Sequence, residues 1–181
     1  MKKLFFAAAV VCLFALAVFA QKAPNFSGTW TLDVSKSKLG DRNNIESQTL
    51  TVTQSDKDIK YETATKRTAP TNGGGGGGGM GGGGRGGDMA TTFTLDGKDT
   101  KMDMPGPGGT SSPATMNGKW DGGKLVLTTV RSFTNPQSGE AITSTSKQTW
   151  ELGADGKSLT ITTDSTSPRG TNSTTRVFTK S

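Results

Sequence analysis

Side chains that commonly carry out enzyme chemistry are scarce in this sequence. It contains no histidine, and its single cysteine, Cys12, lies in the apolar segment near the N-terminus. Imidazole is the usual base beside serine and cysteine nucleophiles and a frequent ligand of haem and zinc. The composition therefore excludes histidine-dependent hydrolysis, histidine-held haem and most zinc sites. We expect no catalytic residue, no cofactor and no metal.

Carboxylates remain as candidate catalytic groups, because two acids placed across a sugar can hydrolyse its glycosidic bond. The 15 aspartate and glutamate residues are spread along the chain, and no pair stands out by its spacing. We therefore expect a protein that is not an enzyme, and carboxylate-only hydrolysis is kept as a rival.

Apolar and polar residues alternate with a period of two through most of the chain. Near the start, Phe26, Gly28, Trp30 and Leu32 share one face while the intervening residues are polar. This alternation is typical of a half-buried strand, and threonine, which is abundant here, suits a pleated surface. We predict strands near 26–34, 48–54, 57–64, 90–95, 98–104, 114–120, 123–132, 141–152, 157–163 and 173–180.

The predicted strands are separated by short turn signals. Asp96-Gly97, Asp121-Gly122 and Asp155-Gly156 lie between apolar runs, where glycine readily takes the positive φ of tight hairpins. Residues 35–44 have room for one helical turn that Gly40 would end. The sequence therefore predicts an all-β fold, an antiparallel up-and-down β-barrel of about 8–10 strands.

The first twenty residues have the organisation of a secretory signal peptide. Lys2 and Lys3 precede an apolar run from Leu4 to Phe19, and Ala20 offers a small residue for cleavage. This run is shorter than the roughly 20 residues that span a bilayer. We predict a signal peptide at 1–20, a single mature domain at 21–181, a secreted or periplasmic location and no stable membrane insertion.

Charge and low-complexity segments limit the possible partners. Two of the 21 lysines and arginines would leave with the signal peptide, which gives the mature chain a net charge near +4, with both signs interspersed. Residues 73–87 are glycine except for Met80 and Arg85, and they lack the Lys-Ser/Thr ending of a phosphate-binding loop. We expect a disordered loop there, a Pro/Gly loop at 105–113 and no nucleic-acid partner.

Short motifs at both ends of the mature chain resemble the calycin barrels, which include lipocalins and fatty-acid-binding proteins. Asn25–Trp30 and Thr175–Lys180 are similar to the first and last strands of that fold. Lys119–Gly122 and Thr128–Arg131 resemble later hairpins of the fatty-acid-binding branch. The resemblance implies a lipocalin-like barrel.

The resemblance also implies roles for particular residues. In calycins, a first-strand tryptophan closes one barrel end and a last-strand arginine packs across it, so Gly28, Trp30 and Arg176 are expected to close the barrel. Inward arginines of late strands meet a ligand carboxylate in the fatty-acid-binding branch. Candidate ligand-binding residues are therefore Arg131, Arg176, Trp120 and Phe178.

Each candidate has a plainer interpretation. Arg131 could be an exposed charge at a strand end, and Trp120 could belong to the core or rim. Phe178 stands where the fatty-acid-binding branch has a hydroxyl-bearing aromatic, and residues 35–46 are too short for the helix pair of that branch.

Two function classes are compatible with the sequence. The first is an exported barrel that binds a small apolar or amphipathic ligand, with a small hydrophobic molecule as the possible partner. The alternative is a structural or surface-interaction module whose barrel is filled by side chains. An outer-membrane barrel is a weaker rival because segments such as 141–149 are almost wholly polar.

Overall fold

The computed structural model describes residues 23–40, 44–68, 90–105, 111–134, 139–168 and 170–181. The predicted signal peptide at 1–20 and the predicted loop at 73–87 lie outside these residues. So does the middle of the predicted loop at 105–113. The described part of the chain contains no helix that is long and apolar enough to cross a membrane.

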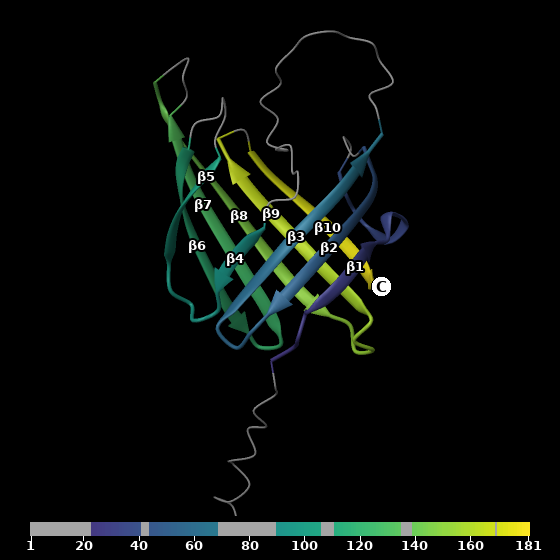
Figure 1. The fold of residues 1–181 in the computed structure, drawn as a ribbon. Helices are drawn as coiled ribbons and strands as arrows, with labels where there is room; N and C mark the ends of the chain where they lie inside the picture. Colours follow the sequence, from purple (N-terminus) through teal and green to yellow (C-terminus); the bar gives the residue numbers. More distant parts are fainter. Residues whose placement is uncertain (1–22, 41–43, 69–89, 106–110, 135–138, 169) are drawn as a thin grey trace, which may run out of the picture.

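Within the described residues, ten antiparallel strands form one sheet that curls into a barrel (Figure 1). Each strand pairs with its neighbour in sequence except at one place, and β1 also pairs with β10, which joins the two ends of the chain. The order around the sheet is β4-β3-β2-β1-β10-β9-β8-β7-β6-β5. The strands are β1 (Gly28–Leu32), β2 (Ile45–Gln54), β3 (Asp58–Arg67), β4 (Thr91–Thr94), β5 (Thr100–Pro105), β6 (Ser111–Asp121), β7 (Lys124–Thr134), β8 (Ala141–Leu152), β9 (Ser158–Ser167) and β10 (Gly170–Lys180).

The sequence prediction of an all-β, up-and-down barrel is confirmed. Every predicted strand corresponds to an observed one, and Gly97, Gly122 and Gly156 take φ values of 74°, 59° and 65°, as their turns require. The predicted loop at 105–113 is wrong at its described ends. Pro105 closes β5, and residues 111–113 already pair with β5 as part of β6.

The barrel closes between β4 and β6 rather than through a β4–β5 hairpin. Gly97 follows β4 and donates its N–H to the carbonyl of Gly118 in β6 over 3.0 Å. A Cβ on Gly118 would collide with the carbonyl oxygen of Thr94, so glycine allows the two backbones to approach closely. The turn at Asp96-Gly97 therefore leads from β4 to β5, although these two strands do not pair with each other.

One end of the barrel is filled by large apolar side chains. The Trp30 ring is fully buried, and its Nε1 donates to the carbonyl oxygen of Phe26 over 2.8 Å. Phe26 also stacks on Trp120, with ring centroids 6.0 Å apart, and meets Trp150 edge-on at 5.7 Å. This end is a packed core in which aromatic rings interdigitate.

The predicted helical turn after the first strand is a short 3-10 helix, η2 (Val34–Lys36). The Asp33 carboxylate caps it by accepting from the N–H groups of Ser35 and Lys36, over 3.1 and 3.2 Å. The chain then crosses to β10, where Lys38 pairs with Thr175. This connection lies against β2 and β10.

Candidate ligand-binding site

A cavity of about 260 Å³ lies inside the barrel, between the inward faces of five strands. Its lining residues lie at the middle of β2, β3 and β9 and in the second halves of β8 and β10, next to the packed core. The lining residues are Gln48, Leu50, Tyr61, Thr63, Gln148, Trp150, Ile161, Thr163, Arg176 and Phe178.

The cavity has an apolar floor, which is the upper surface of the packed core. Leu50, Trp150 and Phe178 are buried to 1% exposure or less, and Ile161 is buried beside them. Cross-strand pairing explains their grouping, because Ile161 is the partner of both Trp150 and Arg176. The floor thus offers aromatic and branched aliphatic surface to an apolar group.

Arg176 brings a positive charge to this apolar floor. Its Nε atom is buried and has no hydrogen-bond partner, and no described carboxylate lies within ion-pair distance of it. Burial lowers the pKa of the guanidinium, and the nearby charge of Arg67 lowers it further. Arginine nevertheless stays protonated at neutral pH, so the cavity contains a half-buried cation that has no described carboxylate within ion-pair distance.

A chain of hydrogen bonds crosses the barrel beside this cation. The indole Nε1 of Trp150 donates to Oε1 of Gln148 over 2.9 Å, and Gln148 Nε2 donates to the hydroxyl of Tyr61 over 3.3 Å. The pKa of Tyr61 is raised, mainly by burial. The Tyr61 ring also lies 5.3 Å from Trp150. Residues 87 positions apart in the sequence therefore form one polar bridge between β3 and β8.

Charges on the described strands are segregated between the two faces of the barrel wall. Three arginines pair with inward-facing residues of the neighbouring strands, namely Arg67, Arg131 and Arg176. The aspartates and glutamates of the described strands occupy outward-facing positions. Examples are Glu46 and Glu151, which form exposed ion pairs with Lys66 and Lys124. The interior toward the open end is therefore cationic and favours an anionic guest.

The four predicted ligand contacts separate into two groups. Arg176 and Phe178 line the cavity. Arg131 lies on the inner face of β7, half-buried, where its Nη2 donates to the Ser112 hydroxyl over 3.2 Å, outside the cavity lining. Trp120 stacks on Phe26 in the packed end. Trp120 therefore packs in the core, which was the plainer interpretation of this residue. Arg131 is half-buried on the inner face, so it is not the exposed charge at a strand end that its plainer interpretation described.

The predicted closure of the barrel by Arg176 across Trp30 is wrong. Lys180 is the register partner of Trp30 and places its Nζ 5.1 Å from the ring centroid. Arg176 lies four residues earlier on β10, opposite Ile161, and reaches the cavity instead. Gly28 does belong to the closed end: its φ is +133°, and a Cβ there would come within 3.0 Å of the Lys180 stem.

Sequence reasoning missed the residues that form the polar part of the site, namely Gln48, Gln148 and Tyr61. Each occupies an inward parity position on its strand, in register with apolar neighbours such as Leu50 and Trp150. The available signal was therefore a polar residue at a position where the alternation predicts an inward-facing apolar residue. The sequence does not show which of these residues meet across the barrel, because it does not give the strand register.

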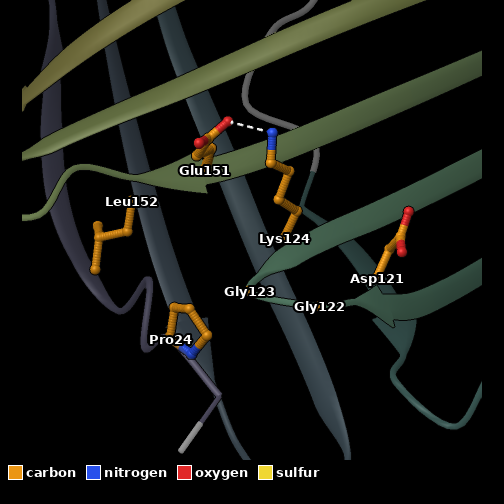
Figure 2. Close-up of a pocket in the computed structure, with 7 residues that line it drawn as sticks. All are labelled: Pro24, Asp121, Gly122, Gly123, Lys124, Glu151 and Leu152. Carbon is orange, nitrogen blue, oxygen red and sulfur yellow. Dashed lines mark ion pairs between the residues drawn. The ribbon is translucent and has the colours of Figure 1, made fainter. Parts of the chain in front are cut away.

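A second hollow, of about 510 Å³, lies at the surface near the opposite end of the barrel (Figure 2). Pro24, the β6–β7 turn and the end of β8 line it. Its Lys124 is already paired with Glu151 at 2.9 Å, and both side chains are about half exposed. Although it is larger, this hollow offers little buried apolar surface and its cation is neutralised, so it is the weaker candidate site.

Comparisons with known proteins identify a similar structure but no family. No family model matches the chain, and no curated protein matches it. Among solved structures, the chain is similar to zebrafish ileal bile acid-binding protein in complex with cholic acid. The identity is 18% and the TM-score is 0.47, and the match covers 86% of this chain and 98% of that one.

Proposed function

We propose that this protein is an exported carrier or sensor that binds a small amphipathic anion inside its barrel. The observation that carries the proposal is the Arg176 guanidinium, whose buried Nε lacks a hydrogen-bond partner at the edge of an apolar cavity. A buried cation without a counter-ion is unfavourable, and an entering carboxylate would supply the missing acceptor. The apolar floor of Trp150, Ile161 and Phe178 would hold the rest of the ligand.

Binding is a better account of this cavity than catalysis. Among its lining residues, only Tyr61 is of a type that carries out general acid–base chemistry, and burial raises its pKa further from neutrality. Export is supported by the sequence alone, through Lys2, Lys3 and the apolar run that ends before Ala20.

Calorimetric titration of the mature chain with matched ligands tests the proposal. Phenylpropionate and its neutral alcohol differ in charge but share the apolar group. We expect the acid to bind at least tenfold more tightly, because a charge-assisted pair contributes roughly 1.5–3 kcal/mol. Arg176→Gln should remove this preference, whereas Lys147→Gln, which removes an exposed charge on β8, should retain it.

Two results would contradict the proposal. Equal affinity for acid and alcohol would show that Arg176 does not recognise an anion. Absence of binding by either compound, or by any other small anion, would favour the filled-barrel module, because the packed end of the barrel already shows that side chains can fill this interior.

A further inference from the structure

The polar groups around Arg176 provide specificity beyond a single charge, and this specificity rests on the proposed function, anion binding inside the barrel. Gln148 has a fixed orientation: the Trp150 indole is a donor only, so the glutamine must turn Oε1 toward it. Its Nε2 therefore faces Tyr61 and the cavity. One N–H of this amide bonds the tyrosine, which leaves the second N–H available to a guest.

Gln48 lies across the cavity in the opposite orientation. Its Nε2 donates to the hydroxyl of Thr65 over 2.8 Å, and the residue as a whole is only 8% exposed. With one amide N–H held by Thr65, Gln48 offers its carbonyl oxygen and its second N–H to a guest. The cavity therefore combines a cation, an oriented donor and an oriented acceptor.

These oriented groups match a hydroxyl better than they match an alkyl chain. A hydroxyl can both donate to an amide oxygen such as Gln48 Oε1 and accept from an amide N–H such as that of Gln148, whereas a methylene can do neither. Sites built to bond a ligand hydroxyl reject analogues that lack it more strongly than apolar pockets reject added groups.

The size of the cavity limits the guest further. Its 260 Å³ corresponds to about nine water molecules at roughly 30 Å³ each. This is below the range of about 300–1,000 Å³ that is typical of pockets for drug-sized ligands. A long alkyl chain or a steroid would have to extend beyond the cavity, among the serine and threonine side chains of the inner wall.

From this geometry we infer that the barrel selects compact hydroxylated organic acids, with Gln48 and Gln148 as the specificity-determining pair beside Arg176. The carboxylate pairs with the guanidinium, the hydroxyl bridges the two glutamines, and a short apolar body rests on Trp150 and Phe178. Both glutamines are held in place by protein partners before a ligand arrives.

Calorimetric titration with four acids tests this inference: phenylpropionate, its para-hydroxy derivative, palmitate and cholate. For the wild type, we expect the para-hydroxy acid to bind at least tenfold more tightly than each of the other three. Gln48→Met and Gln148→Met should each reduce the ratio between hydroxylated and plain phenylpropionate toward one. Lys147→Met, which changes the outward-facing neighbour of Gln148 on the same strand, should preserve that ratio.

The outcomes separate this inference from the proposed function. Equal binding of the two phenylpropionates, or tighter binding of palmitate or cholate, would overturn the specificity for compact hydroxylated acids and leave anion binding intact. A ratio that survives both glutamine substitutions would overturn the role of the pair. Failure of all four acids to bind would contradict the proposed function as well.

Discussion

Arg176 occupies a position that is unfavourable for the empty protein. Its Nε is buried without an acceptor, and the nearby Arg67 adds like-charge repulsion. An unsatisfied buried donor lowers stability, and proteins can retain such a group where function requires it.

This opposition predicts the effect of replacing the charge by an apolar side chain of similar length. Arg176→Met should raise the free energy of unfolding of the ligand-free protein by about 1 kcal/mol, because an unsatisfied buried donor is removed. Urea denaturation measures the change, and binding of phenylpropionate should be lost in the same variant. A less stable variant would instead give Arg176 a structural role.

At the scale of elements, the approach of β4 to β6 closes the barrel. Gly118 permits this approach, since a Cβ would meet the carbonyl oxygen of Thr94 and the side chains of Phe93 and Leu127. We expect Gly118→Ala to lower the free energy of unfolding by roughly 1–3 kcal/mol, the usual cost of overpacking. Gly123→Ala is the matched control, because its Cβ would lie in open space. Equal stability of the two variants would show that the β4–β6 contact does not constrain the barrel.

The connection between β1 and β2 has a pH-dependent component. Hydrogen bonds from Ser35 and Lys36 lower the pKa of Asp33 to about 2 from 3.8. A lowered folded-state pKa means that this stabilisation is complete above about pH 4 and is lost as the pH falls through about 2. The stability difference between wild type and Asp33→Asn should therefore shrink between those two pH values. A difference that stays constant down to pH 2 would show that the carboxylate charge does not support η2.

The elements themselves were predictable from sequence because period-two alternation and Asp-Gly turns are local signals. They predicted all ten strands, and misjudged only the ends of the 105–113 segment and the β4–β5 connection.

The site was not predictable to the same extent. Phe178 and Arg176 were chosen by resemblance, but Gln48, Tyr61 and Gln148 meet only through the register of β2, β3 and β8. Likewise, the residue over Trp30 is Lys180 and not the predicted Arg176. The two lie four residues apart on β10, and only the pairing of β10 with β1 shows which of them faces Trp30.

The whole molecule combines a packed apolar end with a polar, cationic end. Rings of Phe26, Trp30, Trp120 and Trp150 fill the first, and the cavity with Arg176 begins where this packing stops. The sequence left open whether the barrel is hollow or filled, and the structure shows both conditions in one interior. The filled half supplies a rigid floor, and the hollow half provides a binding site for a guest.

Native mass spectrometry of the mature protein, purified from the cells that produce it, tests the central claim most directly. The account predicts that the wild type carries one compact organic anion per chain and that Arg176→Gln, prepared in the same way, carries none. A wild-type protein that is empty as isolated and takes up no added organic acid would contradict it.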